Sequence, residues 1–267
     1  MRAPTPRFPP EKRNKFGISY ERARAVYAHA ATLPGIEVTG IDMHIGSQIT
    51  ELQPFEDAFR LLRELVEVLR TDGHAISHVD IGGGLGIPYR DDNNPPPLPD
   101  AYAHIVKNEL KSLNCKIVTE PGRLIVGNAG ILVTEVIYVK DGGDKTFVIV
   151  DGAMNDLIRP TLYEAYHGIR PVVQPSEDAP RIKADIVGPV CETGDYLALD
   201  REMAAPQPGD FIAVSSAGAY GAVQAGTYNS RLLVPEVLVK GDRFHVIRPR
   251  GTYEELIALD SVPAWLD

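Results

Sequence analysis

Three short apolar runs in the first half of the chain each end in a polar motif that contains glycine. The motifs are HIGSQ (44–48), GGGLG (82–86) and EPGR (120–123). Between these runs, apolar residues recur at helical spacing over 54–70 and around 102–113. Strands that alternate with helices form a parallel sheet with right-handed crossovers, so all three motifs are expected at the same carboxyl edge. Barrels of this α/β type keep their chemistry at that edge.

The spacing of apolar and turn residues divides the chain into two domains. We expect helices at 20–31, 54–70 and 102–113, and strands at 36–45, 79–81 and 116–119. Beyond about residue 130 the pattern predicts strands alone, at 131–140, 146–150, 182–187, 210–214, 232–239 and 244–247. We therefore expect an α/β domain over 15–130 and an all-β domain over 131–267. Residues 1–14 are proline-rich and charged, which favours a disordered leader.

The charge balance and the cysteine content favour a small-molecule function. The chain has 27 basic and 36 acidic residues, a net charge of -9, and its basic residues are scattered, so a nucleic-acid partner is not expected. The longest apolar stretch, 131–139, contains Thr134 and Glu135 and is too short to span a membrane. Two cysteines are too few for a disulfide framework, which favours a reduced, cytoplasmic setting.

The glycine run has two readings. It could be only a tight turn, or its backbone N–H groups could approach an anion closely. Its position after a buried strand favours the second reading. Because the glycines do not open a helix directly, their spacing is unlike the dinucleotide fingerprint, and a single phosphate is the better fit.

The polar residues of the other motifs can also be interpreted as either structural or functional groups. Glu120 and Arg123 could form a local ion pair, or Glu120 could keep a pyridine nitrogen protonated while Arg123 binds a carboxylate. His44 could be a structural group, or it could lie against a cofactor ring with the Ser47 hydroxyl donating to a phosphate. Cys191 beside Glu192 could be a buried thiol next to a surface acid, or a catalytic pair.

As a set, the motifs of this chain resemble those of one enzyme family. HIGSQ, VDIGGGLGIPY, EPGR, MNDLIRPTLYEAYH, CETGD and GAYG stand in the order and spacing of the diaminopimelate decarboxylases, pyridoxal-phosphate enzymes of the alanine-racemase-like fold class. The resemblance runs from Lys15 nearly to the end. It implies a partial (β/α)8 TIM barrel followed by a β-sandwich-like domain. It also implies a homodimer with active sites shared between subunits.

The resemblance also implies roles for individual residues. The positions that match the cofactor set are His44, Ser47, Gly82, Gly83, Gly84, Glu120, Gly122, Arg123 and Tyr220. Those that match the substrate set are Arg123, Arg159, Tyr163, Glu192 and Tyr220. Cys191 matches the proton donor, which the family presents to the neighbouring subunit's site.

The implied reaction is the decarboxylation of meso-diaminopimelate to L-lysine and carbon dioxide in lysine biosynthesis. Diaminopimelate carries an ammonium and a carboxylate at both ends, so two arginines and an acid suit it. An ornithine site would gain nothing from a second arginine, which would repel the distal ammonium. The alternatives are a decarboxylase of another basic amino acid or of a carboxy-polyamine, and a non-catalytic partner subunit.

One departure from the family pattern concerns the lysine that holds the cofactor covalently. In the family it lies on an early barrel strand upstream of the segment KFGIS, which here begins at Lys15. No lysine of this chain stands in that context. We therefore expect a truncated piece of a longer enzyme, inactive as given; a real short product is the competing explanation.

Overall fold

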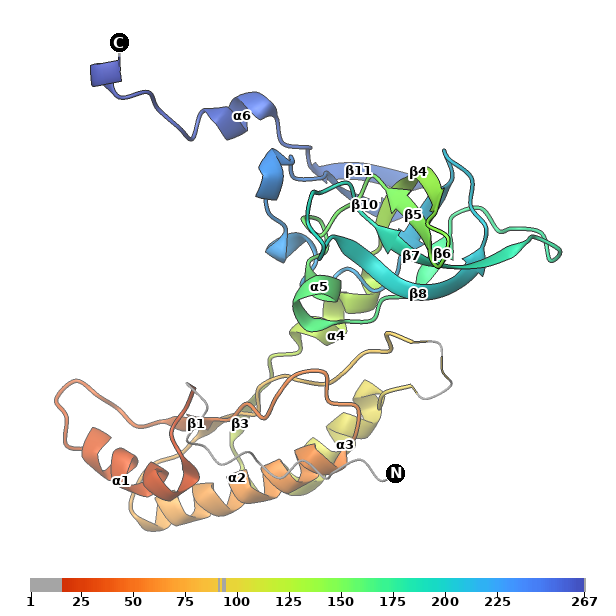
Figure 1. The fold of residues 1–267 in the computed structure, drawn as a ribbon. Coiled ribbons are helices and arrows are strands. Elements are labelled where there is room, and N and C mark those ends of the chain that lie inside the picture. Colours follow the sequence, from red (N-terminus) through yellow and green to blue (C-terminus); the bar gives the residue numbers. More distant parts are fainter. Residues whose placement is uncertain (1–15, 91, 93–94, 267) are drawn as a thin grey trace. The chain divides into compact units, whose positions relative to one another are not determined.

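The computed structural model describes residues 16–90, 92 and 95–266, and it divides them into two units (Figure 1). Unit 1 comprises the described residues of 16–88 and 95–125. Unit 2 comprises 89, 90, 92 and 126–266. The expected leader at 1–14 lies outside the described residues. The expected boundary at 130 compares with an observed one after Ile125, and the short segment that begins at Tyr89 also belongs to unit 2.

Unit 1 contains a parallel three-stranded sheet. Its strands are β1 (Gly40–Asp42), β2 (His78–Asp80) and β3 (Lys116–Val118), in that order. Both pairs are parallel, with Ile41 opposite Val79 and Val79 opposite Ile117. This confirms the predicted alternation of strands and crossover helices. The strand expected over 36–45 is shorter in the structure.

The helices of unit 1 pack on the strands through one apolar face. They are α1 (Tyr20–Ala30), α2 (Gln53–Thr71) and α3 (Pro99–Leu110), followed by the 3-10 turn η2 (Lys111–Leu113). In α2, the buried Phe55, Phe59, Leu62, Val66 and Leu69 recur every three or four residues and pack in one core with Val79. Burying each such side chain stabilises the fold by roughly 1.5 to 3 kcal/mol. Packing of this helical face therefore fixes the position of β2 and of the glycine run that follows it.

Unit 2 is built around one six-stranded sheet of order β6-β9-β4-β5-β7-β8. Its strands are β4 (Leu132–Asp141), β5 (Thr146–Val150), β6 (Ile169–Pro171), β7 (Arg181–Val187), β8 (Tyr196–Ala204) and β9 (Phe211–Val214). The β5–β7 pair is parallel and the other pairs are antiparallel. The outer strands β6 and β8 also contact each other, so the sheet is nearly closed like a barrel.

Several expectations for this part of the chain need correction. The β-sandwich-like arrangement is replaced by one curled sheet. Beyond residue 130 the chain is not strands alone, because it also contains α5 (Arg159–Tyr163), α6 (Tyr253–Ile257) and the 3-10 turns η4 (Ala222–Gln224), η5 (Tyr228–Ser230) and η6 (Ala264–Leu266). Strand β8 was missed because neighbouring Leu197 and Ala198 are both buried and Asp200 has a positive φ, which breaks the alternation of buried and exposed positions. Before residue 130, the short helix α4 (Gly122–Val126) and the 3-10 turn η3 (Gly127–Ala129) were also missed.

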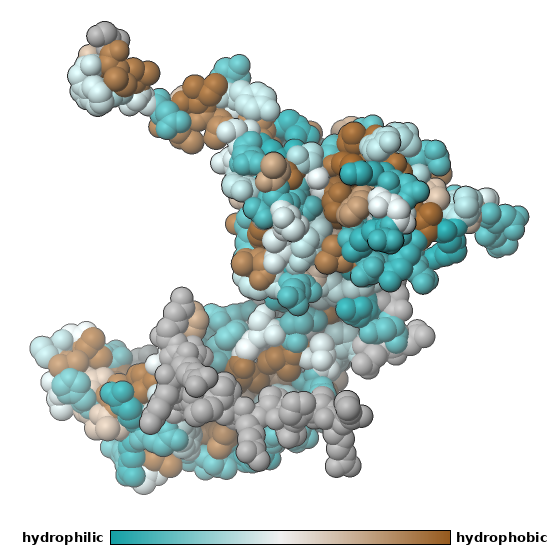
Figure 2. Space-filling view, in the orientation of Figure 1, coloured by the Kyte–Doolittle hydropathy of each residue, from teal (hydrophilic) through white to brown (hydrophobic). Residues whose placement is uncertain are grey.

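The last part of unit 2 has much apolar surface. Strands β10 (Glu236–Lys240) and β11 (Arg243–Arg248) form a separate antiparallel hairpin. Several of its apolar side chains are exposed, as are Leu259 and Trp265 after α6, and Figure 2 shows apolar surface along this C-terminal segment. Among the described residues, no helix combines the length and the hydropathy that crossing a membrane requires.

Candidate functional site

The carboxyl edge of the sheet in unit 1 carries the three glycine-containing motifs. Backbone hydrogen bonds continue the sheet beyond the strands: Met43 N–H donates to Asp80 O at 3.0 Å, and Glu120 N–H donates to Gly82 O at 2.9 Å. Because the strands are parallel, the segments that follow them stay side by side. His44, the glycine run and Glu120 therefore lie at one edge, as the sequence predicts.

The glycines of this edge allow its three loops to pack backbone against backbone. A Cβ built on Gly83 would overlap the carbonyl oxygen of Glu120, and one on Gly84 would overlap the carbonyl oxygen of Gly46. A Cβ on Gly82 would lie 2.7 Å from Met43 O and 2.9 Å from His44 Nδ1. Glycine is thus required here by close approach alone, apart from any role in binding an anion.

Two N–H groups of the glycine run already have partners within the protein. Gly82 N–H donates to Asp80 Oδ1 at 2.9 Å, and Gly83 N–H points at His44 Nδ1 at 3.5 Å. The second contact is long for a hydrogen bond and would yield to a stronger acceptor. The run therefore offers an anion fewer donors than the sequence alone suggests, but it fixes the His44 imidazole beside Gly83.

Side chains from the first and third motifs meet at the same edge. Arg123 Nη2 donates to Ser47 Oγ at 3.0 Å, which brings a guanidinium and a hydroxyl together next to the glycine run. The Gln48 side chain binds the backbone of Ile87 twice, donating to its carbonyl at 2.7 Å and accepting from its N–H at 3.2 Å. Gln48 was not singled out from the sequence, although it belongs to the HIGSQ motif; it ties the first loop to the second.

Unit 2 holds the remaining predicted residues, and Arg159 is the most buried of them. It begins α5, is 7 % exposed, and its Nη1 lies 2.8 Å from Nε2 of His167. Nδ1 of His167 lies 2.9 Å from Ser215 O, which can only accept, so Nδ1 carries the proton and Nε2 accepts from Arg159. The guanidinium also lies 4.8 Å from the ring centre of Tyr89.

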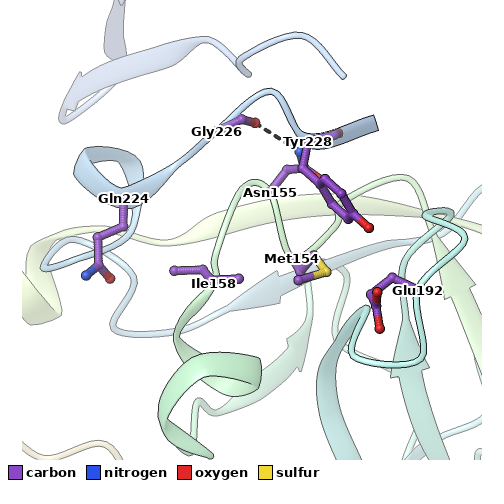
Figure 3. Close-up of a pocket in the computed structure, with 7 residues that line it drawn as sticks. All are labelled: Met154, Asn155, Ile158, Glu192, Gln224, Gly226 and Tyr228. Carbon is purple, nitrogen blue, oxygen red and sulfur yellow. Dashed lines mark hydrogen bonds between the residues drawn. The ribbon is translucent and has the colours of Figure 1, made fainter. Parts of the chain in front are cut away.

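Glu192 lines a pocket of about 370 Å³ in unit 2 (Figure 3). The other lining residues are Met154, Asn155, Ile158, Gln224, Gly226 and Tyr228. Glu192 and the exposed Cys191 stand on the loop between β7 and β8, and the Met154–Ile158 segment leads directly into α5. The structure thus brings the loop that carries Cys191 and Glu192 next to the segment that precedes Arg159.

Several lining residues of this pocket were missed from the sequence. Asn155 Nδ2 donates to Gly226 O and to Tyr228 O, both at 2.9 Å, and so joins the MND segment to η5 and to the residues just before it. The turn segment that carries Gly226 and Tyr228 has no apolar periodicity, and nothing but its density of turn residues marks it in the sequence. Asn155 itself lies inside a motif that the resemblance had already singled out.

Tyr163 and Tyr220 complete the predicted set. Tyr163 ends α5 and is exposed, while Tyr220 follows β9 with a positive φ of 56°. Both belong to unit 2, whereas His44 and Glu120 belong to unit 1. The convergence of all these residues on one cofactor therefore remains a prediction.

Comparison with known proteins shows which family the chain belongs to. The family model described as "Pyridoxal-dependent decarboxylase, C-terminal sheet domain" matches residues 24–218. The chain belongs to the pyridoxal-dependent decarboxylases. The matched region includes the three motifs of the unit 1 edge, α5 and the loop that carries Cys191.

Among pyridoxal-dependent decarboxylases, the chain is similar to several diaminopimelate decarboxylases. It is 51% identical to the one from Pseudomonas aeruginosa over 251 residues, which is 94% of this chain and 59% of the relative. The crystal structure of diaminopimelate decarboxylase from M. jannaschii matches with a TM-score of 0.89 and 36% identity, over 96% of this chain and 59% of that one. The Helicobacter pylori enzyme complexed with L-lysine matches with a TM-score of 0.86 and 38% identity, over 93% and 61% of the two chains. The chain thus spans about six tenths of the length of these relatives.

Proposed function

We propose that this chain forms part of a pyridoxal-phosphate-dependent decarboxylase that converts meso-diaminopimelate to L-lysine and carbon dioxide. The observation that carries the proposal is the packing of His44, Gly83 and Glu120 at one sheet edge, in a chain 51% identical to a diaminopimelate decarboxylase. The three-stranded unit would be the second part of a (β/α)8 barrel. The parallel strands and their crossover helices support that assignment.

Pyridoxal phosphate fits the residues of this edge. The glycine run leaves no room for side chains where it meets the neighbouring loops, and a hydroxyl and a guanidinium stand together nearby. His44 would lie against the pyridine ring, and Glu120 would keep the ring nitrogen protonated, since an opposite charge favours the cation. When bound, the cofactor supplies an electron sink for the departing carboxylate's electrons. The phosphate would be held by Ser47, Gly82, Gly83, Gly84 and Tyr220, and Gly122 and Arg123 would complete the cofactor site.

The substrate would be held by charges that match its two ends. Arg123, Arg159, Tyr163 and Tyr220 would bind carboxylates and orient the reacting end. Glu192 would pair with the distal ammonium, which suits its place among the lining residues of a pocket that also contains Met154, Ile158 and Tyr228. Cys191 would donate the proton that replaces the lost carboxylate. Its thiol is exposed, as such a role requires.

The sharing of active sites within a homodimer is part of the same proposal. Cys191 and Glu192 are exposed on a loop and are available to a neighbouring subunit. Both cysteines are free thiols, which suits the reducing cytoplasm.

The proposal can be tested with a chimera in which this chain replaces the matching region of the Pseudomonas aeruginosa relative. The chimera is produced in a bacterium that lacks its own diaminopimelate decarboxylase and needs added lysine. We expect growth without lysine, and release of carbon dioxide from diaminopimelate but not from ornithine, arginine or lysine. The Glu120→Ala chimera is the control and should lose activity while remaining folded.

Two results would overturn the assignment. A folded chimera that prefers ornithine or arginine would favour a decarboxylase of another basic amino acid. A folded chimera that binds pyridoxal phosphate, seen by its absorbance, but releases no carbon dioxide would favour a non-catalytic subunit.

A further inference from the structure

Asp195 is a buried carboxylate that the proposed reaction does not use. It is 4 % exposed and stands at the end of the CETGD motif, three residues after Glu192. Both of its carboxylate oxygens accept hydrogen bonds. A buried carboxylate is costly unless such bonds compensate it, which makes its partners informative.

The two partners of the Asp195 carboxylate are backbone N–H groups of different loops. Met154 N–H donates to Oδ1 and Val190 N–H donates to Oδ2, each at 2.6 Å. Met154 is a wall of the pocket that Glu192 lines, and Val190 immediately precedes Cys191. One carboxylate therefore joins the pocket wall to the start of the loop that carries Cys191 and Glu192.

The backbone of the same loop closes around this carboxylate. Gly188 N–H donates to Asp195 O at 3.0 Å, and Asp195 N–H donates to Glu192 O at 3.0 Å. A Cβ built on Gly188 would overlap the Asp195 carboxylate, so only glycine fits at that position. The backbone of residues 188–195 thus packs around the buried Asp195 side chain.

A second tether ties the loop to the helix that begins with Arg159. The Thr161 hydroxyl of α5 donates to the carbonyl oxygen of Gly194. Together the two tethers leave little freedom to the short stretch between Val190 and Gly194, although Cys191 and Glu192 themselves are exposed.

We propose that Asp195 is a positioning residue that fixes the Cys191–Glu192 loop against the Met154 wall of the pocket. This rests on the proposed function, which gives Cys191 and Glu192 their roles toward the substrate. Asp195 acts through the backbone of the loop and does not itself touch the substrate. Its charge strengthens both hydrogen bonds, so a neutral amide of the same shape cannot replace it.

The test uses the full 267-residue chain and compares Asp195→Asn with Asp185→Asn. Asp185 is also 4 % exposed in unit 2, but its partners are Lys145 Nζ at 2.6 Å and Asp200 N–H at 2.7 Å, away from the loop. Amide hydrogen exchange is measured at Met154 and Val190. The labelling rate of Cys191 by N-ethylmaleimide is followed by mass spectrometry, with Cys115 as the internal reference.

Asp195→Asn should speed exchange at both amides by about tenfold, the loss expected for one hydrogen bond to a charged group. It should also change the labelling rate of Cys191 relative to Cys115. Asp185→Asn should leave both readouts unchanged at a comparable loss of Tm. Gly188→Ala, which displaces the carboxylate without removing it, should reproduce the Asp195→Asn pattern.

Removing the carboxylate gives a complementary test. Gly188→Ala should perturb Cys191 labelling much less in an Asp195→Ala background, because the added methyl group then has room. The proposal is overturned if Asp195→Asn and Gly188→Ala loosen the loop no more than Asp185→Asn does. None of these measurements needs cofactor or substrate, so their outcome does not depend on the decarboxylase assignment.

Discussion

The Arg159 guanidinium donates a hydrogen bond to Nε2 of His167, a side chain that is fully buried. His167 in turn donates from Nδ1 to Ser215 O, just past the end of β9. One neutral imidazole thus links the first residue of α5 to the sheet and sets where the guanidinium lies.

Replacing His167 by Ala should destabilise unit 2. The change leaves a cavity, and both the buried guanidinium and the Ser215 carbonyl lose a partner, so we expect a loss of about 3 kcal/mol in the free energy of unfolding. Urea unfolding followed by circular dichroism measures it. His245→Ala on the exposed face of β11 is the matched control and should cost little. Equal effects of the two changes would contradict the role given to His167.

Gly83→Ala should disrupt the sheet edge of unit 1. The added Cβ would overlap the Glu120 carbonyl, and such overpacking costs roughly 1 to 3 kcal/mol. Gly122→Ala is the control, because a Cβ there has no atom within 4 Å. Thermal unfolding should separate the two variants. If Gly83→Ala is as stable as Gly122→Ala, the close approach of the two loops is not required by the fold.

Arg159→Ala and Glu192→Gln should each weaken the preference for diaminopimelate in the active chimera. Removing one partner of a desolvated charge pair costs about 2 to 5 kcal/mol in kcat/KM. The assay compares diaminopimelate with lysine and ornithine. Glu202→Gln on the exposed side of β8 serves as a control for loss of one negative charge. An unchanged ranking of the three amino acids in both variants would contradict the charge assignment.

Ionisation of Tyr102 should lower the free energy of unfolding of unit 1 in strong alkali. Burial, followed by the nearby charge of Asp80, raises the pKa of Tyr102 to about 12. Since the folded-state pKa lies above the ordinary value of 10, this contribution to stability is fully present below pH 10 and is lost as the pH rises through 12.

Urea unfolding between pH 9 and 12 measures this dependence. Tyr102→Phe keeps the edge-on packing against Phe55 and Phe59 and should flatten the pH dependence in that range. Tyr138→Phe, an exposed residue of β4, should not. A profile that Tyr102→Phe leaves unchanged would assign the alkaline loss to other groups.

Local pattern was enough to predict much of unit 1. The apolar spacing from Phe55 to Leu69 can only bury one helical face, and the glycines that follow each apolar run mark where a strand must end. Parallel pairing then places HIGSQ, GGGLG and EPGR at one edge, because the carboxyl ends of parallel strands meet at the same edge of a sheet. These features depend on residues close in sequence, so they can be read from the chain alone.

The tertiary structure alone decided the rest. Strand β8 could not be predicted because its pattern of buried and exposed residues breaks at Asp200. A bulge there moves the later side chains to the other face of the sheet. The partners of Asp195, Arg159 and Gln48 lie from 5 to 41 positions away in sequence. Residue types do not reveal which N–H a carboxylate accepts from or which imidazole nitrogen faces a guanidinium. Those contacts form only when folding brings the distant segments together.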